Sequence, residues 1–437
     1  MSINSKTPRV LVLGGTTHSN LGDLAMQAGI VDWMHSISPG LAVDFLSNNP
    51  AHSIQHINAE RHLQSPDTLL ATPWTHETPQ SDTQRRNAIK IGCRFVRDNK
   101  YPVGNLSTED QQCINEFFSA LDAACAVVVP GSGSMNSLWW HDWLYPKAFT
   151  VLAAFRSGKP VFMSSQGIGP PFTSDLDARL AARMFGFCEL VGVRDGNASA
   201  AILHTLGIDA DKVITTGDDA LLFRSPDPMA AVAAELSAIP PERKIIGINL
   251  RESSSYGRKY PKLDLQYLAV ALDDIGARHN LHFLFIPMSR DAQDNDLTTA
   301  KSIIEKMDEK GRTRLVEKYW DAEQTRHLIG ETDLALGISY HFLLFALSSG
   351  TPALGLCQNP YYKQKLSGLF RLYNCPDWAI ELSPGNPALL TNSFDQLVKQ
   401  KEEVTALLEA DKARVHALFA SGRKQLAEAL RNTIEED

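Results

Sequence analysis

The chain has 437 residues, which is more than one hydrophobic core usually serves, and this length predicts two domains. Its 43% hydrophobic content is that of a globular protein, and its formal net charge of −8 argues against nucleic acid as the main partner. The six cysteines form no C-x-x-C pair, which excludes a zinc ribbon or a thioredoxin-type motif and fits a reducing compartment.

The chain shows no pattern typical of membrane insertion or secretion. Its first apolar run, Val10 to Leu13, is too short for the core of a signal peptide. The longest later run, Phe342 to Leu347, is far shorter than the about 20 residues that cross a bilayer. We therefore expect a cytoplasmic protein without an integral membrane segment.

The first half of the chain alternates strand and helix patterns. Residues 50–110 have weak periodicity and predict a partly helical insertion. Strands that alternate with helices indicate a parallel sheet with crossover helices. The predicted strands are 9–13, 41–46, 126–130, 160–164, 190–193 and 213–216, and the predicted helices are 23–35, 175–187 and 199–206.

A proline-rich stretch, Ser225 to Arg243, predicts a hinge before a second alternating series. We expect an α/β fold of two Rossmann-like domains: 1–225, a hinge at 226–243, 244–392, and a C-terminal helical segment at 393–437. The second series predicts strands at 245–250, 282–286, 334–338 and 352–356, and helices at 264–280, 292–308 and 342–349.

The loops that follow the strands hold the candidate binding residues, because open parallel sheets bind ligands beyond the carboxyl ends of their strands. After the first strand, Asp23 either caps a helix or contacts a ligand, and the two readings are equally supported. The loop is not G-x-G-x-x-G, which disfavours NAD. Gly131–Ser134 and Gln166–Pro170 are read either as tight turns or as loops that let a ligand approach the backbone.

Several cations also follow strands, mostly in the second half. Each one alone is more often solvated or paired locally, and together they favour an anionic ligand because guanidinium binds phosphate and carboxylate through two parallel bonds. At the start of a helix, a histidine adds a donor where anions are already favoured. These residues are Arg194, Arg251, Arg258, Lys259, Arg290 and His341.

In their order and spacing, the motifs resemble the polysaccharide pyruvyl transferase family over about residues 9 to 366. The resemblance implies two Rossmann-like domains in a GT-B-like arrangement with an interdomain cleft, and no metal or organic cofactor. The motifs are Gly14-Gly15 with Asn20-Leu-Gly-Asp23, Gly131-Ser-Gly133, Gln166-Gly-Ile-Gly-Pro170, Val193-Arg-Asp195, Asp218 or Asp219, His341 with Gly350-Thr-Pro352, and Tyr362 to Lys365.

The resemblance implies transfer of a pyruvyl group from phosphoenolpyruvate to two hydroxyls of a sugar, giving a cyclic ketal in exopolysaccharide or cell-wall glycan synthesis. The acceptor would be a saccharide or a lipid-linked saccharide, and a homo-oligomer is compatible with the sequence. Asp23, His341 and Arg251 are the expected catalytic residues. The donor would contact Arg251, Arg258, Lys259, Arg290, Ser339 and His341, and the acceptor His18, Asn20, Gly131, Ser132, Gly133, Gln166 and Arg194.

Ser339 departs from the family pattern, since members usually carry an arginine two residues before the histidine. Arg251, Arg258 or Arg290 would then compensate, or the fold would serve another donor. Two alternatives therefore stay open: a GT-B-type glycosyltransferase with a nucleotide-sugar donor, whose ribose carboxylate would be Glu331 or Asp333, and a non-catalytic binding protein.

Overall fold

A computed structural model describes residues 7–15, 19–71, 81–100, 106–225, 228–252, 263–291, 295–382 and 387–436. The contacts within the chain divide it into two compact units. Unit 1 comprises residues 1–18, 26–222 and 418–437, and unit 2 comprises 19–25 and 223–417. Two segments therefore differ from the expected division: Ser19–Ala25 group with unit 2, and Leu418–Asp437 group with unit 1.

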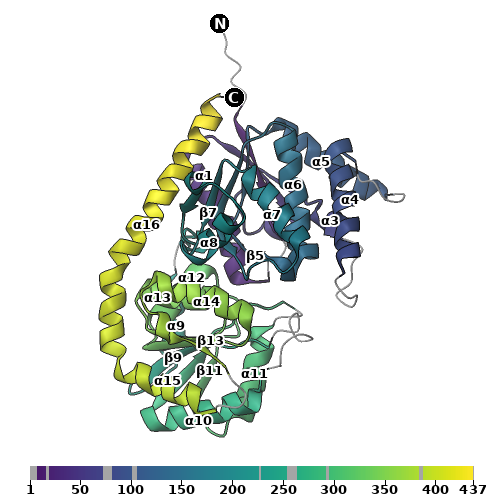
Figure 1. Cartoon of the computed structure of the whole chain (residues 1–437). Helices are drawn as coiled ribbons and strands as arrows, with labels where there is room; N and C mark the ends of the chain where they lie inside the picture. The colour runs from purple at the N-terminus through teal and green to yellow at the C-terminus, as the bar shows by residue number, and fades with distance from the viewer. Residues whose placement is uncertain are drawn as a thin grey trace. The chain divides into compact units, whose positions relative to one another are not determined.

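Unit 1 contains an eight-stranded parallel sheet with the order β3-β2-β1-β4-β6-β7-β8, to which β5 adds by pairing with β6 (Figure 1). The inner strands are buried along their whole length, which explains why they read as continuous apolar runs. The strands are β1 (Arg9–Leu13), β2 (Ala42–Ser47), β3 (Arg61–Gln64), β4 (Ala126–Val129), β5 (Ser132–Met135), β6 (Val161–Ile168), β7 (Leu190–Val193) and β8 (Val213–Thr215).

The helices of unit 1 precede or follow these strands along the chain, and α4, α6 and α7 lie side by side (Figure 1). The segment 50–110, for which the sequence predicted a partly helical insertion, contains in its described residues β3, the helices α2, α3 and α4, and the start of α5. The helices are α1 (Leu21–Ile37), α2 (Pro50–Ser53), α3 (Asp67–Ala71), α4 (Asp82–Asp98), α5 (Thr108–Ala123), α6 (Tyr145–Arg156), α7 (Asp175–Gly186) and α8 (Ala198–Thr205).

Unit 2 contains a six-stranded parallel sheet with the order β11-β10-β9-β12-β13-β14. Its core includes Ile246, Phe283 and Leu336, each with no exposed surface. The strands are β9 (Lys244–Asn249), β10 (Leu281–Phe285), β11 (Thr313–Leu315), β12 (Leu334–Gly337), β13 (Ala353–Cys357) and β14 (Ala379–Glu381).

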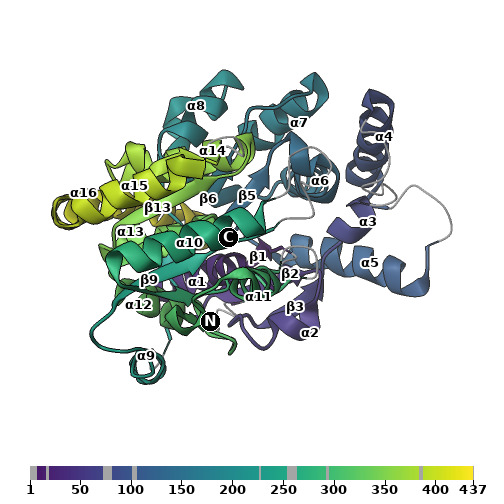
Figure 2. The same ribbon diagram turned by 90° about the horizontal axis from the view of Figure 1, so that it is seen from below.

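In unit 2, α10 packs beside α11 and α15, and α12 packs beside α9 and α13 (Figure 2). None of the helices in the described residues is both long and apolar enough to cross a membrane. The helices are α9 (Met229–Leu236), α10 (Leu265–His279), α11 (Asp296–Lys306), α12 (Ala322–Gly330), α13 (Tyr340–Ser349), α14 (Pro360–Leu372), α15 (Pro387–Lys399) and α16 (Lys401–Glu436).

The last part of α16 is held in unit 1 by a close backbone approach and a buried ion pair. A Cβ at Gly422 would overlap the carbonyl of Thr215, so only glycine lets the helix come this near to β8. The next residue, Arg423, donates to the fully buried carboxylate of Asp219 at 3.0 Å. Asp219 also accepts from the Gly131 amide at 3.2 Å and the Ser164 hydroxyl at 2.8 Å.

Burial raises the pKa of Asp219 to about 6, and the guanidinium of Arg423 opposes this rise only in part. The folded protein thus binds a proton at Asp219 more tightly than the unfolded chain does. The contribution of Asp219 to stability is fully present below about pH 4 and is lost as the pH rises through about 6.

We therefore expect the stability difference between the natural protein and Asp219→Asn to fall by about 3 kcal/mol from pH 4 to pH 6 and to stay constant above it. Urea unfolding at a series of pH values measures this difference. Asp211→Asn, at an exposed aspartate, serves as the control and should show no such slope. Equal pH profiles for the two variants would contradict the raised pKa.

Candidate functional site

A buried amide holds together three neighbouring strand ends at the carboxyl edge of the sheet in unit 2. Asn249 is the last residue of β9, which lies between β10 and β12. Its Nδ2 donates to the Ile286 carbonyl at 2.9 Å, and its Oδ1 accepts from the Ser339 amide at 3.3 Å. Because one 1% exposed side chain bonds both neighbours, the loops after β10 and β12 are fixed relative to each other.

A buried carboxylate, Asp296 at the start of α11, completes this network. Its Oδ2 accepts from Asn249 Nδ2 at 2.9 Å and from the amides of Met288 and Ser289 at 2.8 and 2.9 Å. Arg251 donates to the same carboxylate through two bonds, of 2.6 and 3.1 Å. The two side chains are 9% and 1% exposed, so they form a buried ion pair with its hydrogen-bonding capacity largely used.

This ion pair bears on the expected role of Arg251. The sequence predicted a guanidinium directed at the donor, whereas the structure places its fork on Asp296. A buried arginine with a bidentate carboxylate partner keeps its neighbours in position. We therefore treat Arg251 as a positioning residue.

The segment Ser19–Ala25, expected on the acceptor side, packs instead on the loop after β10. Asn20 and Ser289 form an antiparallel bridge. The Leu21 amide donates to the Met288 carbonyl at 2.9 Å, and the Arg290 amide donates to the Ser19 carbonyl at 3.0 Å. Asn20 Oδ1 also accepts from the Gly22 amide at 3.1 Å. Asn20 is thus a structural part of unit 2.

The docked segment brings Gly22 against the imidazole of His341. A Cβ at position 22 would overlap the ring, so this contact requires glycine. His341 lies in the first turn of α13 and is 4% exposed. The half-buried Asp23 follows Gly22 in the first turn of α1. All three expected catalytic residues, Asp23, Arg251 and His341, therefore belong to unit 2, and Asp23 directly follows the residue that contacts His341.

Two tyrosines and a lysine extend the site from His341. The ring of Tyr340 meets that of His341 edge-on, with 5.4 Å between centroids. Lys365, from α14, places its Nζ 5.5 Å from the centroid of Tyr340 and 5.3 Å from that of Tyr361, and donates to the Tyr361 hydroxyl at 3.2 Å. The cluster therefore combines an imidazole and a half-buried ammonium at the start of a helix.

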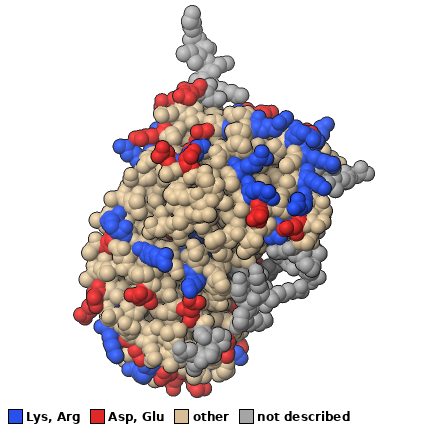
Figure 3. All heavy atoms as spheres, viewed as in Figure 1, with Lys and Arg blue, Asp and Glu red and all other residues tan. Residues whose placement is uncertain are grey.

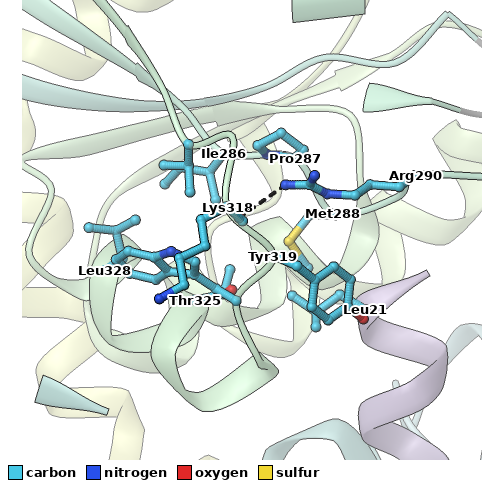
Figure 4. Close-up of a pocket in the computed structure, with 11 residues that line it drawn as sticks. Leu21, Ile286, Pro287, Met288, Arg290, Lys318, Tyr319, Thr325 and Leu328 are labelled. Carbon is cyan, nitrogen blue, oxygen red and sulfur yellow. Dashed lines mark hydrogen bonds between the residues drawn. The ribbon is translucent and has the colours of Figure 1, made fainter. Parts of the chain in front are cut away.

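Arg290 lines a nearby hollow of about 320 Å³, open solvent included, beyond the ends of β10 and β11 (Figure 4). Its Nη2 donates to the carbonyls of Glu317 and Lys318 at 2.6 and 3.0 Å, and its guanidinium lies 5.8 Å from the centroid of Tyr319. Leu21 reaches the same hollow. Arg290 thus lies beside the segment Ser19–Ala25, which contacts His341. Part of its hydrogen-bonding capacity is already used by the two carbonyls.

In unit 1, two expected acceptor residues are buried in the structure. Gln166 has no exposed surface, and its Nε2 donates to the carbonyls of Pro130 and Ser164, both at 2.8 Å. Arg194 is 2% exposed, lies against Gly167 and pairs with Asp218 at 3.5 Å. Both side chains support the loops around them rather than offering a surface to a sugar, and Gln166 belongs to β6 rather than to a loop.

The other expected acceptor residues of unit 1 lie where the sheet ends. Gly131 precedes β5, and Ser132 and Gly133 belong to it. Ser132 Oγ accepts from the Ser134 amide at 3.0 Å, while Gly133 is half-buried. The expected site residues His18, Arg258 and Lys259 lie outside the described residues.

An aromatic turn stands at the same edge of the unit 1 sheet. Trp140–Leu144 form a short π-helical turn that runs directly into α6, and such turns occur often at functional sites. The half-buried ring of Trp143 covers Gly15, just after β1. Beneath it, Lys147 donates to the carbonyls of Leu13 and Gly14 at 3.1 and 2.8 Å, which fixes the end of that strand.

Sequence reasoning overlooked the residues that hold the site in unit 2. Asn249 was detectable as the one amide that ends an otherwise apolar strand, and Lys365 as the lysine of the Tyr362–Lys365 element. Asp296 had no signal beyond that of a helix cap. Within the described residues, no three His, Cys, Asp or Glu side chains are grouped so that they could hold a metal ion.

Comparisons with solved structures show the fold. A UDP-GlcNAc 2-epimerase from Neisseria meningitidis bound to UDP-GlcNAc has a TM-score of 0.57 and 14% identity, covering 98% of this chain and 100% of its own. Anabaena Alr3699/HepE in complex with UDP has a TM-score of 0.56 and 13% identity, covering 97% and 100%. At such identities the likeness shows a GT-B-like fold alone.

Sequence comparisons show the family. Amylovoran biosynthesis protein AmsJ of Erwinia amylovora is 23% identical over 393 residues, covering 86% of this chain and 88% of that protein. The polysaccharide pyruvyl transferase family matches residues 20–356, from the Asn20 that docks on the loop after β10 to the end of β13. The chain is thus a member of the polysaccharide pyruvyl transferase family.

Proposed function

We propose that this protein transfers a pyruvyl group from phosphoenolpyruvate to two hydroxyls of one sugar, with release of phosphate. The observation that carries the proposal is the contact between Gly22 and His341, which lie at opposite ends of the family match. This contact brings the imidazole, in the first turn of α13, against the residue that precedes Asp23 in α1.

The start of α13 suits a donor with two acidic groups. The first amides of a helix and its dipole favour an anion, and His341 adds a side-chain donor there. Ser339 stands where the family usually has an arginine, and its side chain makes no capping bond. Lys365 is the cation beside the intervening Tyr340, so we assign it the charge that Ser339 lacks.

Chemically, the reaction needs a proton on the methylene carbon of the donor and the loss of a proton from each attacking hydroxyl. Protonation of that carbon makes the neighbouring carbon electrophilic, and the first sugar hydroxyl adds there. The phosphate leaves with the electron pair of its C–O bond, and the second hydroxyl closes the ketal. We assign Asp23 as the base for a hydroxyl, and His341 with Lys365 as the groups that stabilise the departing phosphate.

For the acceptor we propose a saccharide or lipid-linked saccharide of exopolysaccharide or cell-wall glycan synthesis, handled in the cytoplasm. The name of AmsJ places that relative in amylovoran biosynthesis. Trp143 offers an amphipathic ring of the kind that stacks on sugars, beside Gly15 at the carboxyl edge of the unit 1 sheet.

A nucleotide-sugar glycosyltransferase is the alternative, since two structural neighbours were solved with UDP or UDP-GlcNAc. Its ribose carboxylate was expected at Glu331 or Asp333. Both precede β12, at the amino edge of the sheet, and Asp333 accepts from the Ile245 amide at 2.9 Å. Ligands in such folds bind at the carboxyl edge, so these residues do not support the alternative.

His341→Ala should abolish phosphate release from phosphoenolpyruvate in the presence of a saccharide acceptor, and phosphoenolpyruvate should no longer raise its melting temperature. The reason is the loss of the side-chain donor at the start of α13. His416→Ala, at an exposed position of α16, is the matched control. If UDP-sugars stabilised the protein and phosphoenolpyruvate did not, the glycosyltransferase would replace this proposal; unchanged phosphate release by His341→Ala would refute the assignment.

Arg251→Ala should destabilise unit 2 by about 3–5 kcal/mol, because it leaves the buried carboxylate of Asp296 without its cation. The double variant Arg251→Ala/Asp296→Asn should recover part of this loss, since the unpaired charge is then gone. Denaturant unfolding of the single and double variants measures both values. A fully stable Arg251→Ala protein with weakened phosphoenolpyruvate binding would restore Arg251 as a direct donor ligand.

A further inference from the structure

Helix α4 carries a stripe of exposed cations that the proposed chemistry does not use. Arg86, Lys90, Arg94 and Arg97 follow one another at intervals of four, four and three residues. At this spacing, side chains share one face of a helix. The opposite face is buried: Phe95 has no exposed surface, and Gly92 lies against the ring of Phe149 in α6. The four cations of α4 therefore lie on its exposed side, opposite the side that packs against α6.

The two helices beside α4 continue this surface. Arg156 ends α6, and Arg179 and Arg183 stand one turn apart on α7, all exposed. Arg97 pairs with the exposed Asp98 through two bonds, of 2.6 and 2.8 Å, and this pairing, together with the charges of Arg94 and Arg156, lowers the pKa of Asp98. Figure 3 shows Lys and Arg gathered over the part of unit 1 where Figure 1 draws these helices.

We use the name basic face for the seven exposed cations of these three helices: Arg86, Lys90, Arg94, Arg97, Arg156, Arg179 and Arg183. Among the described residues of α4, α6 and α7, three exposed carboxylates oppose them: Asp82, Asp98 and Asp175. The surplus of positive charge contrasts with the net charge of −8 for the whole chain. Since charges beyond about 8 Å are screened at physiological salt, a partner at this surface meets the local cations rather than the net charge.

A pair of aromatic rings, one exposed and one half-buried, adjoins the basic face. Phe155, 47% exposed, precedes Arg156 and stacks on Phe187 with 3.9 Å between ring centroids. Cations beside exposed aromatic rings suit the headgroup region of a bilayer, where charge meets phosphate and rings enter the interface. A nucleic acid partner would use the cations without needing the apolar pair.

We propose that the basic face docks this protein on an anionic lipid surface. The seven cations would pair with lipid phosphates, and the rings of Phe155 and Phe187 would enter the interface beside them. Peripheral binding of this kind needs no spanning helix. The proposal does not rest on the pyruvyl transfer proposed above, because none of these residues belongs to the candidate site.

The test is sedimentation of the full chain with vesicles of phosphatidylcholine alone and with equal parts of phosphatidylglycerol. The natural protein should bind the anionic vesicles, and rising salt should release it. Arg86→Glu/Lys90→Glu/Arg94→Glu should lower the partition coefficient more than about hundredfold, at about fivefold or more for each cation. Phe155→Ser should lower it less, and the effect should persist at high salt.

A control variant separates local from overall charge. Lys306→Glu/Lys310→Glu/Lys399→Glu changes the net charge equally at exposed positions of unit 2, and it should keep anionic-vesicle binding within a few-fold of the natural protein. Equal losses in both triple variants, or no binding by the natural protein, would overturn the proposal. Tighter binding to a DNA duplex than to the vesicles at the same salt would also overturn the proposal, provided that the α4 triple variant abolished the binding to DNA. Melting curves and phosphate release with a soluble acceptor should be unchanged in the α4 variant.

Discussion

The contact of the His341 imidazole with the bare backbone of Gly22 is the constraint on which the candidate site depends. It requires that the segment Ser19–Ala25 be bound to the loop after β10, within unit 2. Two backbone hydrogen bonds supply that attachment, one to the Met288 carbonyl and one from the Arg290 amide, on either side of Ser289. Three residues of the motif Asn20-Leu-Gly-Asp23 are thereby explained: Asn20 accepts from the Gly22 amide, Leu21 bonds to the loop after β10, and Gly22 makes room for the imidazole.

Both units use the same device to fix the ends of their strands. In unit 2, the buried Asp296 accepts from backbone amides and from Arg251, and in unit 1 the buried Asp219 accepts from the Gly131 amide and from Arg423. A buried carboxylate is costly unless its hydrogen bonds are made. Each unit meets this cost with an arginine and neighbouring amides, so the strand ends lose their freedom to move apart.

Much of the fold was predictable, because inner parallel strands are buried on both faces and therefore read as continuous apolar runs that alternate with helical patterns. The strands that were not predicted have physical reasons. Three of these strands, β3, β11 and β14, are edge strands, so each has a neighbouring strand on one side and needs fewer apolar residues. They are also only three or four residues long. β5 was read as a glycine turn, and β6 runs to Ile168 through residues that the sequence placed in a loop.

The site was predictable in kind and less so in detail. Asp23 and His341 were selected as candidates from their motifs, but no local pattern reveals that they belong to one unit. Charged side chains were harder still, since Arg251 reads the same in sequence whether it meets a ligand or Asp296. Only the position of α11 decides this, and it depends on tertiary packing of residues far apart in the chain.

The most direct test of the account is phosphoenolpyruvate binding by Gly22→Ala, measured by isothermal titration. The added methyl displaces the imidazole, so the affinity should fall at least about tenfold. Gly186→Ala in α7, where a Cβ meets nothing nearer than 3.9 Å, controls for the substitution itself and should bind normally. Unchanged affinity in Gly22→Ala, with a melting temperature equal to that of the natural protein, would contradict the claim that this contact positions His341 for the donor.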